Sequence, residues 1–139
     1  MSDITHKFVA VLNKKIEPGK LMNALAHASV VLGELCPDKV NMRISNYADK
    51  DGNDHFCSDN PYIILAADNS NKIRTLRTEL IRNGVCFTDF THSMTIGSYQ
   101  EQKDRTKTIP EAELEYYVIA MFGEMELLST LTKKFSLWK

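Results

Sequence analysis

Four side chains that could support acid–base chemistry stand at positions that a sheet would bring together. They are Lys20, His27, Asp89 and Ser93. In open α/β sheets, ligands bind beyond the carboxyl ends of the strands, and both the turn into a helix at Gly19 and the strand end at Asp89 lie at such an edge. A carboxylate beside an imidazole fixes the tautomer of the ring, as a general base or a proton shuttle requires. The alternatives are a histidine that bonds to a carbonyl at the core edge and an aspartate that caps a strand.

Lys20 occupies a position in which a cation is unfavourable unless something balances it. It falls in the first turn of the expected helix, where the positive end of the helix dipole costs a lysine about 0.3–1 kcal/mol. A bound anion would remove this cost, and Gly19 would let the anion approach the backbone closely. The alternative is a solvated lysine that is offset by Glu17.

The helix that carries Lys20 and His27 is bounded by two prolines. Pro18 suits a first helical turn and Pro37 prevents continuation, so we expect a helix between them. Its apolar stripe repeats at steps of three and four residues, through Leu21, Leu25, Ala28, Leu32 and Leu35. Such a stripe packs on a sheet, with His27 at its side and half-buried.

Four apolar runs predict the strands of that sheet, at residues 7–12, 62–67, 85–90 and 116–122. Further helices are expected at 70–83 and 124–133, a hairpin-like excursion within 40–57, and a polar, mobile loop over 92–113. The predicted fold class is therefore α/β, a three-layer α/β/α arrangement around a four-stranded or slightly larger mixed sheet.

The helix predicted at 70–83 separates apolar from basic residues. The expected buried side consists of Ile73, Leu76, Leu80 and Ile81, and the basic residues are Lys72, Arg74, Arg77 and Arg82. A solvated face is the interpretation that we favour for these charges, and phosphate contact is the alternative.

Composition limits the class of protein. A chain of 139 residues with 43% hydrophobic and 25% charged residues suits one domain over residues 1–139. No apolar run has membrane-spanning length and the N-terminus lacks a signal-peptide pattern, so we predict a cytoplasmic protein with no membrane partner. Three widely spaced cysteines, Cys36, Cys57 and Cys86, argue against a disulfide framework and fit a reducing compartment. The net charge of −1 disfavours binding to long nucleic acid.

No motif predicts a cofactor or a metal site. The chain has no phosphate-binding glycine loop and no dinucleotide fingerprint. His55, Cys57, Cys86 and His92 are possible metal ligands, but they lack the paired spacing of known metal sites.

The segment from Gly19-Lys20 to His27-Ala28 resembles the G-K-x-x-x-Q-x-x-H-A signature of the type 2 (archaeal/eukaryotic-type) peptidyl-tRNA hydrolases. Their second signature, D-A-G-x-T ahead of a final strand that ends in glycine, is similar to the segment 89–93 and to VIAMFG at 118–123. The chain departs from the family at Ala24, which replaces a glutamine. It is most similar to a group of bacterial domains of unknown function that share the hydrolase fold.

The resemblance implies specific roles at the matching positions. The catalytic residues would be Lys20, His27, Asp89 and Ser93, with Ser93 in place of a threonine. The ligand-binding residues would be Gly19, Lys20, Asn23 and Thr91. Asn23 lies next to the missing glutamine, and Thr91 replaces a glycine.

Three hypotheses for the function follow. The first is a cytosolic protein of this fold that binds a small anionic or nucleotide-like ligand at an altered site. The second is hydrolysis of peptidyl-tRNA, with the tRNA end as the ligand. The third is a non-catalytic homodimer that acts as a protein-interaction module through Tyr99 and the aromatic C-terminus, Phe135 and Trp138. Under each hypothesis we expect a homodimer.

Overall fold

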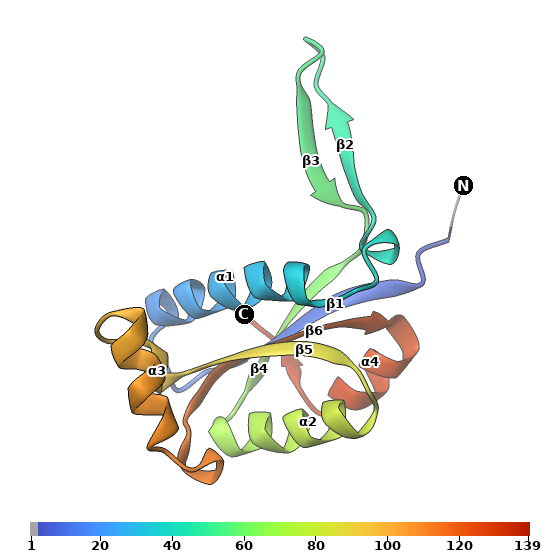
Figure 1. Ribbon diagram of the computed structural model, residues 1–139. Coiled ribbons are helices and arrows are strands. Elements are labelled where there is room, and N and C mark those ends of the chain that lie inside the picture. The colour runs from blue at the N-terminus through green and yellow to red at the C-terminus, as the bar shows by residue number, and fades with distance from the viewer. Residues whose placement is uncertain (1–2) are drawn as a thin grey trace.

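A five-stranded mixed sheet forms the centre of the molecule (Figure 1). In the computed structural model, which describes residues 3–139, the strand order is β5-β6-β1-β4-β7. The strands are β1 (His6–Asn13), β4 (Tyr62–Ala67), β5 (Cys86–Thr91), β6 (Tyr116–Glu124) and β7 (Ser136–Leu137). β1 runs parallel to β4, and the other neighbours are antiparallel. The predicted mixed α/β class is confirmed, and the fifth strand comes from the C-terminal tail, which pairs with β4.

Helices lie on both faces of this sheet (Figure 1). They are α1 (Pro18–Leu35) on one face, and α2 (Ser70–Arg82) and α4 (Met125–Thr132) on the other. Side chains alternate along β1: Ala10 packs with the α1 side and Val9 and Val11 with the α2 side. The strand is apolar throughout because both of its faces are covered.

α1 begins and ends close to where the prolines predicted. Glu17 caps its first turn by accepting a hydrogen bond from the Gly19 amide, and Cys36 ends it. Its buried residues are Leu21, Ala24, Ala28 and Leu32. The prediction that Leu35 is buried is wrong, because the chain turns after it and Cys36 enters the core instead.

α2 follows its predicted boundaries but buries a narrower face. Asn69 caps it through the Lys72 amide, and Gly84, at a φ of 64°, ends it in the left-handed region. The prediction that Ile81 is buried is wrong, since its side chain is 55% exposed. The buried residues of α2 are Ile73, Leu76 and Leu80.

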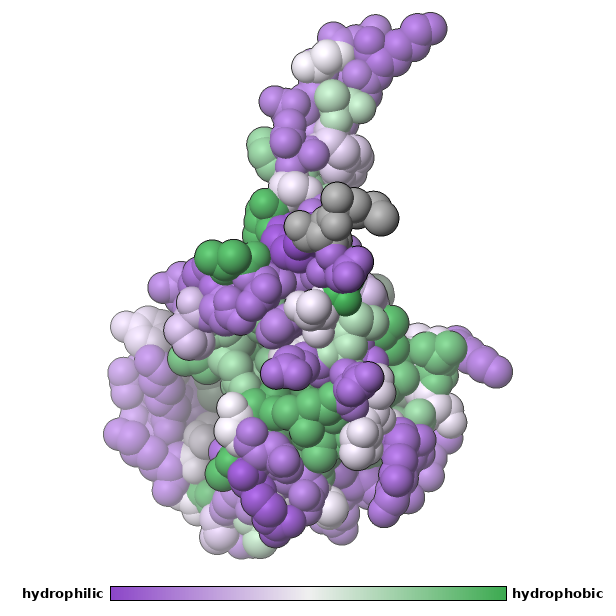
Figure 2. Space-filling view, turned by 90° about the vertical axis from the view of Figure 1, so that its right-hand side faces the viewer, coloured by the Kyte–Doolittle hydropathy of each residue, from purple (hydrophilic) through white to green (hydrophobic). Residues whose placement is uncertain are grey.

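The predicted hairpin is confirmed as an arm that extends away from the body of the molecule (Figures 1 and 2). It consists of β2 (Ile44–Ala48) and β3 (Asp54–Ser58), which pair only with each other. A 3-10 helix, η1 (Val40–Met42), leads into it from the end of α1. At the tip, the Asp49 carboxylate accepts hydrogen bonds from two turn amides. Figure 2 shows hydrophilic side chains at the tip and apolar side chains nearer the base.

The segment 92–113 is more ordered than predicted. It contains α3 (Tyr99–Lys107) between the 3-10 helices η2 (His92–Met94) and η3 (Glu111–Glu113). α3 starts with a capping box formed by Ser98 and Glu101. The helix buries no residue, so it has no apolar periodicity that would distinguish it from a polar loop.

The prediction about the cysteines is wrong for two of them. Cys36, at the end of α1, and Cys86, at the start of β5, form a disulfide across 50 residues of sequence. They meet because α1 lies over β5, while Cys57 stays free on the arm. The disulfide removes one of the grounds for expecting a reducing compartment.

A membrane-spanning helix must be both long and apolar. None in the described part of the chain combines the length and the apolar character needed to cross a bilayer.

Candidate functional site

A cavity of about 460 Å³ opens between the first half of α1 and the segment that follows β5. Its lining residues are Glu17, Gly19, Lys20, Asn23, His27, Phe90, Met94, Thr95, Ile96 and Gln102. Four of the residues singled out from the sequence, Gly19, Lys20, Asn23 and His27, therefore share one hollow.

The polar side of this cavity comes from one flank of α1. Lys20, Asn23 and His27 follow one another at steps of three and four residues, which places them on the same helix face. The prediction that His27 is half-buried is wrong, because the residue is exposed, although its ring stacks on Phe90 of β5 with 5.5 Å between ring centroids. Within residues 3–139, none of these three polar side chains has a hydrogen bond or an ion pair to another protein group. Their donors and acceptors are free to meet a ligand.

The backbone at the start of α1 is already satisfied. The Glu17 side chain accepts a hydrogen bond of 2.8 Å from the Gly19 amide, and the Glu17 carbonyl accepts from Lys20 and Leu21. An anion in the cavity would therefore be held by side chains and not by free helix amides.

Ser93 and Thr91 are not among the residues that line the cavity. Both are buried, and the Ser93 hydroxyl oxygen is 2.8 Å from that of Thr91 and 2.7 Å from that of Thr106. The bonds to Thr106 tie α3 to the end of β5. The structure therefore gives these two predicted site residues a buried, hydrogen-bonded position away from the group on α1.

Asp89 lies on the opposite face of the sheet from His27. Its neighbours Thr88 and Phe90 face α1, where the Thr88 hydroxyl donates to the Ala28 carbonyl over 2.8 Å. Asp89 consequently points toward α2 and accepts a 3.0 Å hydrogen bond from Arg77. The expected convergence of Asp89 with His27 does not occur, because alternate side chains of a strand point to opposite faces.

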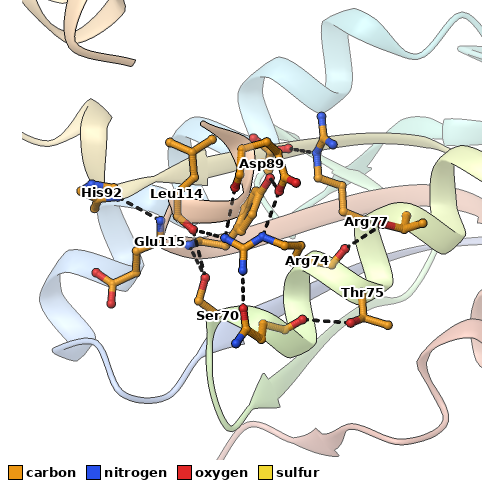
Figure 3. Close-up of polar contacts among 12 residues, drawn as sticks. Ser70, Arg74, Thr75, Arg77, Asp89, His92, Leu114 and Glu115 are labelled. Carbon is orange, nitrogen blue, oxygen red and sulfur yellow. Dashed lines mark hydrogen bonds and ion pairs between the residues drawn. The ribbon is translucent and has the colours of Figure 1, made fainter. Parts of the chain in front are cut away.

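A second polar cluster surrounds this aspartate on the α2 side (Figure 3). Arg74 donates to the Glu111 carboxylate over 3.0 Å, to Asn71 and to the carbonyl of Leu114. The Tyr116 hydroxyl donates to the same carboxylate over 2.7 Å. Because the charged groups of this cluster are bonded to one another, it holds η3 against α2 and leaves little for a ligand.

The basic residues of α2 therefore differ from the predicted solvated face. Partial burial opposes the charge on Arg77 most strongly. The hydrogen bond to Asp89, together with the charge interactions with Tyr116, Asp89 and Glu111, outweighs burial and raises the pKa of the guanidinium. Arg74 stacks over the Tyr116 ring at 5.3 Å. Both arginines bond to other segments of the same chain, whereas Lys72 and Arg82 remain at the surface.

This cluster predicts how stability depends on pH. The hydrogen bond from Tyr116, followed by the bond to Arg74, lowers the pKa of Glu111 below its ordinary value of 4.5. A lowered pKa in the folded state stabilises the protein above the unfolded pKa, and this contribution is lost as the pH falls through the folded value. Urea unfolding between about pH 6 and about pH 3 should show a steeper loss of stability for the wild type than for Glu111→Gln. Glu113→Gln, its neighbour in η3, should keep the wild-type slope, and a common slope for all three proteins would contradict the prediction.

Sequence reasoning missed the far wall of the cavity. Thr95, Ile96 and Gln102 belong to the segment predicted as a loop. The one signal for α3 was the capping-box spacing from Ser98 to Glu101, which predicts a helix start and would have placed Gln102 in its first turn.

The fold and the site define an α/β protein with a partly basic cavity beside its first helix. The chain belongs to the family described as protein of unknown function (DUF2000), which matches residues 6–139. The solved structure of a protein of unknown function, Atu0240 from Agrobacterium tumefaciens strain C58, is similar with a TM-score of 0.82. That similarity covers 99% of this chain and 100% of the other at 14% identity, so it concerns the fold alone. A comparison with curated proteins finds no match.

These findings confirm the expected membership of a family of unknown function. They add no support for a relationship to the peptidyl-tRNA hydrolases, which rests on the motif residues alone.

Proposed function

We propose that the protein binds a small anionic or nucleotide-like ligand in the cavity beside Lys20. The observation that carries the proposal is the set of Lys20, Asn23 and His27 on one helix flank, facing Gln102 across a cavity of about 460 Å³. These three side chains have no partner among residues 3–139. A lysine supplies charge-assisted hydrogen bonds to a phosphate oxygen, and the neutral donors around it add direction. The apolar Phe90, Met94 and Ile96 provide a surface for the flat part of a nucleotide-like ligand.

We also propose that the fold is a three-layer α/β/α arrangement. α1 on one face and α2 with α4 on the other support a three-layer arrangement like that of the type 2 peptidyl-tRNA hydrolases. Hydrolysis of peptidyl-tRNA is the less favoured function. Asp89 is bonded to Arg77 on the opposite face, and Ser93 is enclosed by two other hydroxyls, so neither stands beside His27.

Calorimetric titration with inorganic phosphate and with AMP tests the proposal. Lys20→Ala should weaken binding of both by at least about tenfold, because it removes a charge-assisted hydrogen bond worth about 1.5–3 kcal/mol. Lys133→Ala is the matched control, since this lysine lines a different hollow between α2 and the C-terminal segment. Glu17→Gln should bind at least as tightly as the wild type, because it removes a negative charge from the cavity.

Two results would contradict the proposal. One is a folded wild type that binds neither anion at millimolar concentration, on the order of the weakest specific affinities. The other is an unchanged affinity in Lys20→Ala together with a loss in Lys133→Ala, which would move the site to the other hollow.

A further inference from the structure

Large apolar side chains that remain in solvent are concentrated in one segment of the chain. Among residues 3–139, eight of the thirteen exposed large hydrophobic residues fall within 22–56: Met22, Val30, Val31, Leu35, Val40, Ile44, Tyr47 and Phe56. Four of them lie on α1 and the other four on η1 and the arm. Exposed apolar side chains that gather in one part of a protein mark an interface more often than the same residues scattered singly.

The arm is a structure that a covering surface would stabilise. It is an isolated two-stranded ribbon, which is marginally stable in water unless it packs against something. Its register pairs Ile44 with Ser58 and Phe56 with Asn46, so the two apolar side chains share one face. Both are about 70% exposed, at 67% and 71%. Nothing in the described part of its own chain covers that face.

The exposed flank of α1 and the arm have complementary side chains along their lengths: each is apolar at one end, and the other ends carry opposite charges. Lys20, His27, Val31 and Leu35 follow at steps of seven, four and four residues, so they line one helix face that is basic at its start and apolar at its end. The arm is apolar near its base, at Ile44 and Phe56. Its tip carries three carboxylates and one lysine: Asp49, Asp51, Asp54 and Lys50.

The exposed flank of α1 is long enough to accommodate the arm. From Lys20 to Leu35 the helix rises by roughly 22 Å, at about 1.5 Å per residue. The strand part of the arm, from Ile44 to Ala48, extends roughly 13 Å, at about 3.3 Å per residue, and the turn at 49–53 continues beyond it. Figure 1 shows that the arm begins near the end of α1 and extends away from the helix, so helix and arm form an L.

We propose that a second copy of this chain covers the arm in a two-fold dimer. The arm of each copy lies along α1 of the other, with its base near Val31 and Leu35 and its acidic tip near Lys20. Such an interface is isologous, because each copy contributes the same helix and the same arm. The charge order fixes the direction of the arm, since the reverse direction would place the carboxylates beside Leu35 and leave Lys20 against Ile44.

The C-terminal aromatic residues are not available for this role. Phe135 and Trp138 pack against the two core clusters of their own chain, and the Trp138 amide donates to the Ile64 carbonyl. Tyr99 remains exposed, but it stands on the polar α3 with a lysine over its ring. The arm and α1 therefore form the better surface for a dimer.

Sedimentation equilibrium of the full chain tests the proposal. The buffer should have low salt and no phosphate, because an anion at Lys20 would compete with the tip of the arm. The wild type should sediment as a dimer, at twice the chain mass of 15.8 kDa. Ile44→Ser/Phe56→Ser should be a monomer with an unchanged circular dichroism spectrum, since neither residue belongs to a core cluster. Ile81→Ser, which changes an apolar residue of α2 that is 55% exposed, should remain a dimer.

A charge exchange tests the direction of the arm. Asp51→Lys should weaken the dimer by about tenfold or more, and adding Lys20→Asp should restore it. A wild type that is monomeric at about 100 μM would overturn the proposal, as would a dimer that survives Ile44→Ser/Phe56→Ser.

Discussion

Replacing Leu80 with alanine should lower the free energy of unfolding by about 2–5 kcal/mol. Leu80 is fully buried on the inner face of α2, in the core cluster that also contains Ile119 and Met121 of β6. Alanine would remove apolar contacts and leave a cavity that the rigid sheet cannot fill. Urea unfolding measured by circular dichroism gives the change directly.

The adjacent residue supplies the control. Ile81→Ala changes an apolar side chain that is 55% exposed, so its effect should stay within about 0.5 kcal/mol. Equal losses for the two variants would mean that α2 packs through a different face. The comparison tests the orientation of α2, and with it the position of Arg77 beside Asp89.

Replacing Arg74 with alanine should lower the free energy of unfolding by about 1–3 kcal/mol. Its guanidinium is bonded to the Glu111 carboxylate and to backbone carbonyls at Glu111 and Leu114, and only 18% of its side chain is exposed. Without it, each of these acceptors would lose its charged donor and keep a neutral one. These are the Tyr116 hydroxyl for the Glu111 carboxylate, the Leu114 amide for the Glu111 carbonyl and the Ser70 hydroxyl for the Leu114 carbonyl. Arg74→Lys should recover little, because a lysine cannot make several bonds in a fixed plane.

Arg82 on the same helix is the matched control. Its side chain is 67% exposed and bonds Glu79, one turn away, so Arg82→Ala should cost at most about 0.5 kcal/mol. Hydrogen exchange should also become faster around η3 in Arg74→Ala and not in Arg82→Ala. If the two variants were equally stable, the cluster of Figure 3 would not hold η3 in place.

Much of the fold was predictable because local chemistry and packing agree. Prolines on both sides and an apolar stripe marked α1, and a continuous apolar run marked β1 as a strand buried on both faces. Turn residues between two short runs marked the arm. Each of these elements is specified by residues that lie close together in the sequence, so one sequence is enough to predict it.

The errors concern contacts that depend on tertiary structure. The disulfide joins residues 50 positions apart that meet only once α1 lies on β5. Asp89 was placed at the correct edge of the sheet, but a strand covered on both faces gives no sign of which face each residue takes. α3 was missed because it packs no apolar face.

The candidate site was predicted in part for the same reason. Gly19, Lys20, Asn23 and His27 share a cavity because one helix carries them, and helical spacing is readable from sequence. Residues expected from the distant strand did not join them.

The most direct test of the proposed site is the amide NMR spectrum of the protein during titration with phosphate. Binding beside Lys20 predicts shifts that saturate together at Gly19, Lys20, Asn23, His27 and Gln102, the residues that line the cavity from both sides. Shifts that are absent there, or that cluster around Lys133 and Lys134 in the other hollow, would contradict the account.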